Sequence, residues 1–400
     1  MKSLKKSNIK VLHLARWYPN RYDPMPGLFI QRHAEAANKY CDVGVVYTHV
    51  VEDQKIKGIY ELEARVIKGV PTAKVYYSNP KLTIPLITPL IKIFRFYKSN
   101  YLGIQKIKQQ LGGFDLVHVH ILTRLGVMAL YYKWFCNKPF IVTEHWSRYL
   151  GLTGSFTGTF RKAVTKLIVR NTAVLTTVTQ NLANAMQEHG LKNKHYKVLA
   201  NVVDEPFFQP GLPEKKNQGK KTFVHVSCFE DKSKNISGLL RVIKLLSEKR
   251  SDFVFRFIGE GMDFESLYNY SRELGLDEPT VVFTGLLEGE KLVKEMAAAD
   301  LMVVFSNYEN FPVVINESFV LGIPVVASNV GGIPEYVNKN NGRLVKAGDE
   351  KALENLLDEF LDKKLSFDNQ KIRLTSGDAF SPETIGQELL KIYKETISKP

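Results

Sequence analysis

Two glutamates, Glu309 and Glu317, lie eight positions apart on either side of the run Asn-Phe-Pro-Val-Val-Ile-Asn. The apolar residues 301–305 precede them and predict a strand, so Glu309 falls on the following loop and Glu317 on the next helix. Amides at a helix N-terminus favour a phosphate, and carboxylates accept hydrogen bonds from hydroxyl groups. This combination predicts a pocket for a diphosphate flanked by the hydroxyls of a ribose and of a sugar.

Strand-like apolar runs alternate with helix-like segments along the whole chain. This alternation predicts an α/β fold with parallel sheets and right-handed helical crossovers. In the first half the predicted strands cover residues 9–15, 43–48, 74–77, 116–120, 140–143, 174–178 and 197–199. In the second half they cover residues 222–226, 253–258, 281–283, 301–305, 325–327 and 342–345. Ligands bind at the carboxyl ends of such strands, so the candidate residues should gather there.

The alternation is interrupted at residues 201–221, where prolines, glycine and polar residues are concentrated. We place the linker between two domains there, and a length of 400 residues also favours two domains. The predicted N-terminal domain covers residues 1–205, with the helical segment 382–400 crossing back onto it, and the predicted C-terminal domain covers residues 206–381. Two doubly wound Rossmann-like domains would then face one another across a cleft.

The net charge of +14 is unevenly distributed. Residues 1–200 contain 30 Lys and Arg against 10 Asp and Glu, a balance of +20, whereas residues 201–400 contain 25 against 31, a balance of −6. A basic half indicates an anionic partner. We favour a membrane surface or a lipid-linked diphosphate over nucleic acid, for which no motif is present. The alternative is a basic surface that only keeps the protein soluble.

The location of the protein follows from what the sequence lacks. No apolar run approaches the ~20 residues needed to cross a bilayer. The three cysteines show no metal or redox spacing, which favours a reducing compartment. We therefore expect a cytoplasmic protein, with peripheral contact at the inner membrane face as a further expectation from the charge.

Residues 81–110 combine aliphatic and aromatic side chains with Lys92, Arg95 and Lys98. A basic amphipathic helix of this kind can lie in a membrane interface. It could equally pack its apolar face on the sheet, and its two prolines would also suit a mobile flap. The sequence leaves these alternatives open.

The pair Glu309 and Glu317, followed by Gly-Ile-Pro-Val-Val-Ala at 322–327 and Gly-Gly-Ile-Pro-Glu at 331–335, resembles the signature of the retaining glycosyltransferases of family 4. This family is also called glycosyl transferases group 1. The close match spans residues 301–337, and weaker similarity runs from residue 9 to the C-terminus. Members have the GT-B fold of two Rossmann-like domains, and the resemblance implies the same fold here. It also implies that the N-terminal domain, residues 1–205, would bind the acceptor and that the C-terminal domain, residues 206–381, would bind the nucleotide sugar.

The resemblance implies roles for the residues around the two glutamates. Glu317 would bind the ribose hydroxyls of the donor, and Glu309 would face hydroxyls of the transferred sugar. Four neighbours would bring their backbone close to the sugar and the diphosphate: Asn310, Phe311, Pro312 and Val313. Pro312 suits the first turn of a helix because it has no N–H to lose.

Further donor contacts are implied after the other predicted strands of the second half. Lys234 matches a family lysine that grips the diphosphate, where a cation would stabilise the departing nucleotide diphosphate. The family arginine that precedes it is replaced by Cys228, and Lys232 could compensate. The positions near the nucleobase, where glycine permits close backbone approach, are Gly259, Gly261 and Leu286.

In the first half, the long loop of residues 16–27 replaces the family's glycine-rich turn, and only Gly27 remains as a donor contact. Arg16 and Arg32 are candidate acceptor or phosphate contacts, with surface ion pairs as the alternative. His145 matches a family histidine that hydrogen-bonds a sugar hydroxyl near the reacting centre. The alternative for His145 is a capped histidine in a loop.

The sequence predicts neither a metal nor a cofactor. His118 and His120 lie on one face of a predicted strand, but we find no third ligand with useful spacing, so packed core positions are favoured. The chain contains no Asp-x-Asp pair that could clamp a divalent cation on a donor. Helix amides and Lys234 would neutralise the diphosphate instead.

Together these features predict a metal-independent retaining hexosyltransferase in which His145, Lys234 and Glu309 are catalytic. A UDP-sugar donor is favoured and a GDP-sugar is allowed. The acceptor would be a glycan or a lipid-linked molecule in surface polysaccharide or glycoconjugate synthesis. One alternative is a nucleotide-sugar epimerase, and another is a non-catalytic member that binds a sugar nucleotide, which Cys228 would favour. The sequence identifies neither the sugar, the acceptor, the linkage nor the oligomeric state.

Overall fold

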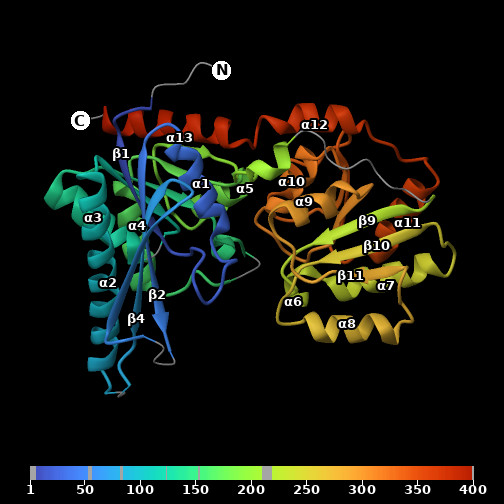
Figure 1. The fold of residues 1–400 in the computed structure, drawn as a ribbon, viewed down its shortest axis with the longest axis horizontal. Coiled ribbons are helices and arrows are strands. Elements are labelled where there is room, and N and C mark those ends of the chain that lie inside the picture. Colours follow the sequence, from blue (N-terminus) through green and yellow to red (C-terminus); the bar gives the residue numbers. More distant parts are fainter. Residues whose placement is uncertain are drawn as a thin grey trace. The chain divides into compact units, whose positions relative to one another are not determined.

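The chain forms two compact units, each with one sheet and surrounding helices (Figure 1). The structure is a computed structural model that describes residues 6–52, 56–81, 84–122, 124–151, 154–209 and 219–398. The first unit comprises Met1–Val178, Ala183–Val202 and Pro382–Pro400, and the second comprises Thr179–Leu182 and Val203–Ser381. The division at 202/203 lies close to the expected one at 205/206. Residues 210–218 of the expected linker lie outside the described residues.

The first unit contains an eight-stranded sheet with the order β3-β4-β2-β1-β5-β6-β7-β8. The central strands are rich in Val, Leu and Ile and are buried along most of their length, which is typical of a parallel sheet covered on both faces. Its strands are β1 (Lys10–Ala15), β2 (Asp42–Val51), β3 (Tyr60–Ile67), β4 (Val70–Ser78), β5 (Leu116–His120), β6 (Phe140–Glu144), β7 (Leu175–Thr177) and β8 (Tyr196–Val198).

The sequence did not predict β3, which pairs antiparallel with β4 at the edge of the sheet. A two-residue turn, Lys68 and Gly69, joins them with positive φ at both positions, as a tight hairpin requires. β3 carries Glu61, Glu63 and Arg65. An edge strand that bears charges lacks the apolar run that marks a buried strand, so an entirely parallel sheet was the wrong expectation.

Helices cover the sheet of the first unit, and two glycines bring one of them close to it. The helices are α1 (Leu28–Asn38), α2 (Ile87–Leu111), α3 (Arg124–Cys136), α4 (Thr159–Asn171), α5 (Gln180–Glu188), which begins in the second unit, and α13 (Pro382–Ile397), with the short 3₁₀-helix η1 (Ser147–Tyr149). A Cβ on Gly44 would lie 2.3 Å from Ile107, and one on Gly103 would lie 2.7 Å from Val46. α2 therefore packs closely on β2.

The long helix α2 has two different parts. Its C-terminal half buries Ile104 and Ile107 against the sheet, as the packing alternative predicted. The first turns expose apolar side chains, among them Leu90 at 65% and Phe94 at 66% of their surface. Within the described residues, no helix combines the length and the apolar character needed to span a membrane.

The C-terminal helix α13 packs on α1 within the first unit. Gly386 makes this possible, because a Cβ there would lie 2.4 Å from the carbonyl oxygen of Ala36. Tyr393 is buried, and its hydroxyl lies 3.0 Å from His13 Nε2 and 2.9 Å from His118 Nδ1. The end of the chain thus completes the core of the N-terminal unit.

The second unit contains a six-stranded parallel sheet with the order β11-β10-β9-β12-β13-β14. Its strands are β9 (Lys221–Val226), β10 (Phe253–Ile258), β11 (Val281–Phe283), β12 (Leu301–Val304), β13 (Val325–Ser328) and β14 (Gly342–Val345). Its helices are α6 (Asp231–Lys234), α7 (Ile236–Ser247), α8 (Phe264–Glu273), α9 (Gly289–Ala297), α10 (Val313–Val320), α11 (Glu350–Leu361) and α12 (Asn369–Gly377), with the 3₁₀-helices η3 (Glu205–Phe208) and η4 (Ile333–Glu335).

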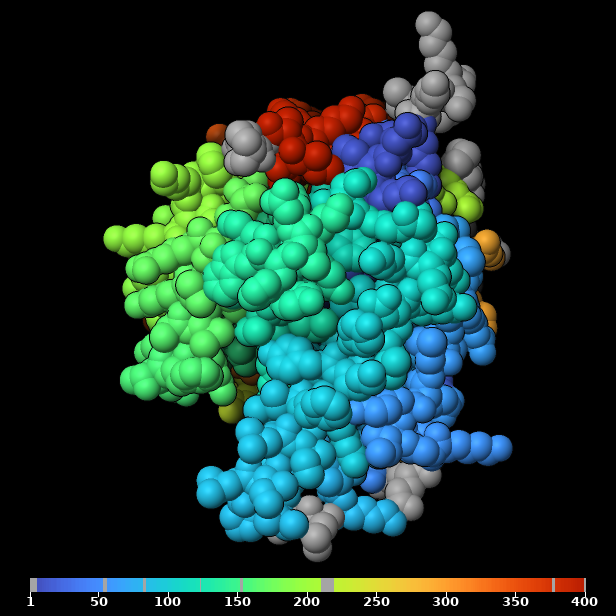
Figure 2. Space-filling model, turned by 90° about the vertical axis from the view of Figure 1, so that its left-hand side faces the viewer, coloured from blue at the N-terminus to red at the C-terminus, as the bar shows by residue number. Residues whose placement is uncertain are grey.

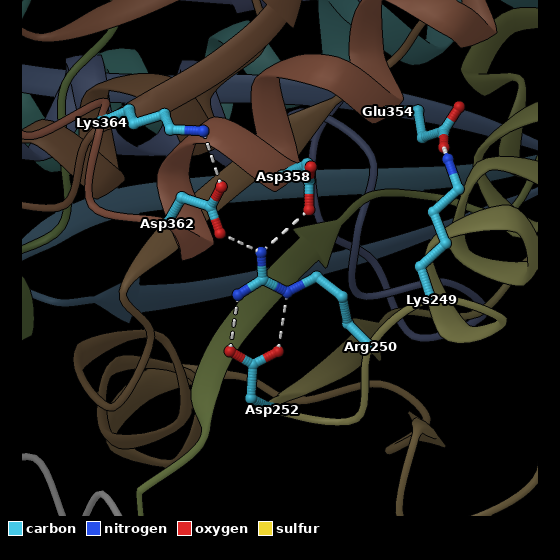
Figure 3. A network of polar contacts seen from close by, with 7 residues as sticks. All are labelled: Lys249, Arg250, Asp252, Glu354, Asp358, Asp362 and Lys364. Carbon is cyan, nitrogen blue, oxygen red and sulfur yellow. Dashed lines mark hydrogen bonds and ion pairs between the residues drawn. The ribbon is translucent and has the colours of Figure 1, made fainter.

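A surface network of charges joins the segment after α7 to α11 (Figure 3). Arg250 donates to both carboxylate oxygens of Asp252 at 3.0 and 2.9 Å and to Asp358 at 2.9 Å, and it also contacts Asp362. Lys249 pairs with the buried carboxylate of Glu354. Single exposed ion pairs contribute little to stability, but a bidentate network fixes the relative position of its elements better.

Candidate functional site

The candidate residues of the second unit gather where the strand order of its sheet reverses. The chain moves outward from β9 through β10 to β11, and then returns to place β12 on the other side of β9. Ligands of doubly wound sheets bind at the carboxyl ends of the strands on either side of such a reversal. Lys234 follows β9 and Glu309 follows β12, so sequence positions 75 residues apart meet at this point.

Lys234 and Glu309 form an ion pair, with 2.5 Å between Lys234 Nζ and Glu309 Oε1. Their side chains are only 16% and 10% exposed. Burial lowers the pKa of Lys234, but Glu309, with smaller contributions from Cys228 and Glu230, outweighs burial, and the net shift is upward. Lys234 therefore remains a cation inside a partly dehydrated site, as a phosphate ligand should.

Ser306, at the end of β12, is a site residue that the sequence analysis missed. Its hydroxyl donates to the same oxygen, Glu309 Oε1, at 3.0 Å. Asn307 donates from its backbone to the carbonyl of Ser233 at 2.8 Å, which ties the two loops together. The position of Ser306, three residues before Glu309 at a strand end, is the only signal that could have found it.

The loop after β13 lies against the loop that carries Glu309. A Cβ on Gly331 would lie 1.9 Å from the carbonyl oxygen of Glu309, and Gly331 has a positive φ of 57°. Gly332 donates its amide to the carbonyl of Asn310 at 2.7 Å. The Asn310 side chain also accepts a hydrogen bond from Thr179 at 3.1 Å. Glycines 331 and 332 are thus needed to hold the Glu309–Asn310 backbone in place.

Glu335 ends the glycine-rich segment, and its carboxylate caps the first turn of α5. Its two oxygens accept the amides of Gln180 and Asn181, each at 2.7 Å. Carboxylates stabilise helix N-termini in this way. The Gly-Gly-Ile-Pro-Glu sequence thus has a structural role that accounts for its acidic residue.

The helix α10 begins directly after Pro312, which adopts an extended conformation. Pro312 therefore precedes the helix instead of occupying its first turn as expected. Phe311 is buried, and its ring packs on that of Tyr336 in a tilted arrangement, with 4.2 Å between ring centroids. Val313 starts the helix, and Glu317 lies in its middle, 3% exposed. This arrangement keeps the Glu317 carboxylate about one helical turn from the free amides of the first turn.

Gly259 and Gly261 bring two backbone segments into close contact. A Cβ on Gly259 would lie 1.9 Å from the carbonyl oxygen of Ser227, and one on Gly261 would lie 2.5 Å from the backbone of Phe229. Packing of the loop after β10 on the loop after β9 is thus sufficient to require glycine at both positions. Leu286, half-buried, follows Gly285, whose carbonyl accepts the amide of Gly259 at 2.9 Å. The predicted nucleobase contacts therefore share one edge of the sheet.

Cys228 is exposed on the loop after β9. Its sulfur is close enough to Lys234 that a thiolate there raises the lysine pKa. Lys232 is also exposed, and its carbonyl accepts a hydrogen bond from Asn307 at 3.1 Å. The loop thus exposes Cys228 and Lys232 where the family arginine is absent.

In the first unit, Gly27 is fixed by its surroundings. It precedes α1 with φ of 76°, and a Cβ there would lie 2.3 Å from the carbonyl oxygen of Trp17. Its loop follows β1, which is where the strand order of this sheet reverses between β1 and β5. Gly27 is therefore positioned at the ligand-binding edge of its own sheet.

Five buried histidines fill the centre of the first unit. They are His13, His33, His118, His120 and His145. The sequence analysis paired only His118 with His120 and treated His145 separately. The ring nitrogens of His13, His118 and His120 lie within 4.8 Å of one another, so His13 from β1 supplies the third candidate metal ligand that spacing did not reveal.

These ring nitrogens already have hydrogen-bond partners. His118 lies 2.7 Å from Thr143 Oγ1 and 2.9 Å from Tyr393 Oη, and His120 Nε2 lies 3.1 Å from His13 Nδ1. Burial lowers the pKa of His13 to about 3 and that of His33 to about 4, so both are neutral at pH 7. Neutral imidazoles that donate and accept in turn can satisfy one another in a dry core. The ring nitrogens of His33, His120 and His145 also lie within 4.8 Å of one another, so packed core positions without a metal stay a prediction.

His145 lies at the edge of this cluster, 9% exposed, with its Nε2 3.4 Å from His120 Nδ1. Burial holds its pKa well below the ordinary value, so the ring is neutral. Glu144 positions this segment: Oε1 accepts the amides of His145 and Trp146, and Oε2 accepts that of Leu122. Burial raises the pKa of Glu144 to about 7, against those three donors. Sequence analysis did not single out Glu144.

Arg16 and Arg32 had been considered for the acceptor or phosphate. Arg16 lies on the rim of a large apolar groove of the first unit, together with Trp146 and Arg148. Arg32 lies on α1 and does not line this groove. Both arginines remain predicted acceptor or phosphate contacts, and only Arg16 adjoins the groove.

Two family descriptions match the chain. "Glycosyltransferase Family 4" matches residues 63–206, and "Glycosyl transferases group 1" matches residues 212–373. The N-acetyl-alpha-D-glucosaminyl L-malate synthase of Bacillus anthracis is 24% identical over 71% of this chain and 75% of its own.

Among solved structures, the lipopolysaccharide outer core galactosyltransferase WaaB has a TM-score of 0.66 at 15% identity, covering 96% of this chain and 99% of its own. Anabaena Alr3699/HepE in complex with UDP-glucose has a TM-score of 0.68 at 18% identity, covering 97% of this chain and all of its own. These likenesses agree with the two Rossmann-like sheets described above. The chain belongs to the family 4 glycosyltransferases, also called glycosyl transferases group 1, and has the GT-B fold.

Proposed function

We propose that this glycosyltransferase is a metal-independent retaining hexosyltransferase whose donor is a nucleotide diphosphate sugar. The observation that carries the proposal is the buried pair of Lys234 and Glu309 at the point of strand-order reversal, next to the N-terminus of α10. An ammonium has three N–H donors. Lys234 can therefore keep Glu309 and still donate to a diphosphate.

Each site residue then has a distinct role. The amides of α10 and Lys234 stabilise negative charge as it develops on the leaving diphosphate. Glu317 accepts from the ribose hydroxyls, and Glu309 accepts from hydroxyls of the sugar. Neutral His145 offers one donor or acceptor to a sugar hydroxyl. No step requires a metal, because the cation and the amides supply the compensating charge.

In the reaction, the bond between the anomeric carbon and the diphosphate oxygen breaks, and a bond from the acceptor hydroxyl oxygen to that carbon forms on the same face. The acceptor proton passes to the leaving phosphate oxygen. We favour UDP over GDP as the nucleotide, since a related fold binds UDP-glucose. The acceptor would be a glycan or a lipid-linked molecule, with the protein acting in the cytoplasm or at the inner membrane face.

A thermal-shift screen against UDP, GDP, ADP and their common sugar conjugates tests the donor. A ligand that binds the folded state raises the melting temperature by mass action. We expect a rise for one nucleotide class that is lost in Glu317→Gln. Glu354→Gln is the matched control, because Glu354 is equally buried in the same unit but belongs to the network of Figure 3.

The same screen can contradict the proposal. If no nucleotide raises the melting temperature of the wild-type chain, the donor site is not functional. A non-catalytic member is the second candidate, favoured by Cys228 in place of the family arginine. It would bind the nucleotide sugar but release no free sugar during long incubation without acceptor, whereas a transferase hydrolyses its donor slowly.

A further inference from the structure

An apolar groove with a volume of about 870 Å³ lies between α2, α3 and α4 of the first unit. Figure 2 shows this face, where the cyan atoms of α2, the blue-green atoms of α3 and the green atoms of α4 come together. Aromatic and aliphatic side chains make up most of its wall, including Tyr131, Trp134, Phe135, Phe160 and Leu167. Of the candidate site residues named above, only Arg16 lines this groove.

The groove exposes large apolar side chains to an unusual degree. Phe160 is 81% exposed, Phe135 is 75% and Trp134 is 53%. A large contiguous patch of exposed apolar surface on a folded domain often marks a binding site. The three side chains come from two neighbouring helices, α3 and α4, so they form one surface.

Positive charge borders this apolar surface. Arg16, Arg124, Arg148 and Arg161 line the groove, and no Asp or Glu does so among the residues that the structure describes. Burial lowers the pKa of Arg148; Tyr149 and Glu144 oppose this, and the nearby charges of Arg161 and Arg16 lower it further. Such a concentration of like charges favours an anion that would bind between them.

The arginine-lined part of the groove lies at the ligand-binding edge of the first sheet. Arg16 directly follows β1, Arg124 begins α3 after β5, and Arg148 lies just beyond β6. These three strands are neighbours, and their carboxyl ends also carry His145. The apolar part continues from this edge along the helices. The groove therefore joins a site for an anion to a site for a hydrocarbon chain.

We propose that this groove binds a lipid phosphate or diphosphate, with its hydrocarbon chain between α3 and α4 and its phosphate at the arginines. This inference rests on the proposed function and specifies its acceptor: the sugar would be transferred to a head group that the arginines hold at the sheet edge. Charge complementarity selects an anionic lipid over a peptide or a zwitterionic lipid. Arg124 and Arg148 also lie over the rings of Phe96 and Trp146, which fixes their guanidinium groups.

The three tryptophans of the chain allow a binding test that needs no transfer reaction. Trp134 and Trp146 line the groove, and Trp17 packs on Trp146 at 5.1 Å between ring centroids. The probe is dodecyl phosphate with bromine at the end of the chain, kept below its micelle concentration. Bromine quenches tryptophan emission on contact. We expect saturable quenching, and at least tenfold weaker binding of brominated dodecanol, which lacks the phosphate.

Two pairs of variants locate the binding. Phe135→Ser and Arg161→Ala should each weaken binding at least fivefold. Their matched controls, Phe94→Ser on the exposed part of α2 and Arg170→Ala on α4, are outside the groove and should leave it unchanged. All four side chains lie on helix surfaces, and the near-ultraviolet spectrum checks that each variant remains folded.

Several outcomes would overturn the inference. Equal binding of the alcohol and the phosphate, or no effect of Arg161→Ala, would show a general apolar surface. The chain could also dimerise through this groove. If Phe135→Ser converts dimers to monomers and the probe does not, a second copy of the chain is the occupant. If UDP raises the melting temperature but the probe does not bind, this inference fails and the proposed function stands. If the probe binds but no nucleotide raises the melting temperature, the groove binds an anionic lipid and the proposed function fails.

Discussion

The site of the second unit depends on one cation held among oxygen atoms. Lys234 is buried enough that burial alone would lower its pKa, and its acidic neighbours, Glu309 foremost, reverse that shift. Glu309 in turn accepts from both Lys234 and Ser306 through a single oxygen, which leaves its other oxygen for a ligand. One ion pair thus both keeps the lysine charged and orients the carboxylate that would face the sugar.

Lys234→Ala should lower kcat by about 10²–10³-fold, because a preorganised cation aimed at a developing charge contributes that much. The melting temperature should also fall, since Glu309 loses its partner in a partly buried place. Initial rates with saturating donor measure the first effect. Lys232→Ala, on the same loop but exposed, should retain most activity. Equal losses in the two variants would assign the effect to the net charge of the loop.

Much of this site could be predicted from residue spacing, and the missing parts depend on contacts over long sequence distances. Glu309 and Glu317 were predicted from their spacing after a strand, whereas the family resemblance implied Lys234. The direct pairing of Lys234 with Glu309, and the hydrogen bond from Ser306, follow only from the reversal of strand order between β9 and β12. The requirement for glycine at 259 and 261 comes from loop packing, which a sequence motif does not distinguish from ligand approach.

Loops hold the site through glycine at defined positions, and Gly331 is the most constrained of them. A methyl group there would enter the space of the Glu309 carbonyl, and φ of 57° already disfavours a side chain. Gly331→Ala should therefore displace the Glu309–Asn310 backbone and abolish the nucleotide-dependent thermal shift. Gly348→Ala has a similar φ of 74° but open space around the position.

The comparison of these two variants separates the effect of backbone strain at the substituted residue from the effect of displacing the Glu309–Asn310 backbone. Both should lose about 1 kcal/mol of stability from the left-handed conformation. Only Gly331→Ala should lose donor binding, measured as the midpoint of a UDP titration. If Gly348→Ala also loses binding, or Gly331→Ala keeps it, the loop after β13 does not position Glu309.

At the level of helices and strands, the sequence predicted the buried parallel strands well and the edge of the sheet poorly. Buried strands such as β12 (Leu-Met-Val-Val) and β13 (Val-Val-Ala-Ser) are short and almost entirely apolar, so they stand out in the sequence. β3 alternates charged and apolar residues, a pattern that marks a half-buried edge strand and that the search for apolar runs passed over. The sequence also could not predict that α2 packs its C-terminal half on the sheet and exposes apolar side chains in its first turns. The same amphipathic pattern fits a packed helix and an exposed one.

Titration of the whole chain should distinguish its two units. Five neutral histidines are buried in the first unit, and only His225, with its pKa lowered by burial to about 4, is comparable in the second. An unfolded chain protonates histidine below pH ~6.5, whereas the folded unit does not. Each histidine then costs about 1.4 kcal/mol of stability per pH unit as the pH falls from 6.5 through the lowered values.

The histidine cluster therefore dominates the acid sensitivity of the first unit. The raised pKa of Glu144 acts in the opposite direction, since the folded unit retains a proton above pH ~4.5 that the unfolded chain loses. One such group offsets one histidine, and about four remain, or roughly 6 kcal/mol per pH unit. A typical domain is stable by about 5–15 kcal/mol, so we expect the first unit to unfold between about pH 6 and pH 4.

Tryptophan emission reads this transition in the first unit alone, because Trp17, Trp134 and Trp146 all lie there, while far-ultraviolet circular dichroism reads both units. We expect tryptophan emission to change at a higher pH than the last part of the change in ellipticity, which reports the second unit.

His33→Gln keeps a donor for the carbonyl of Ala200, which His33 Nε2 contacts at 3.0 Å. This variant should make the emission transition shallower by about one proton. The exposed His195→Gln should not change its slope. Coincident transitions below pH 4 would mean that the cluster takes up protons without unfolding, and that the imidazoles are hydrated in solution.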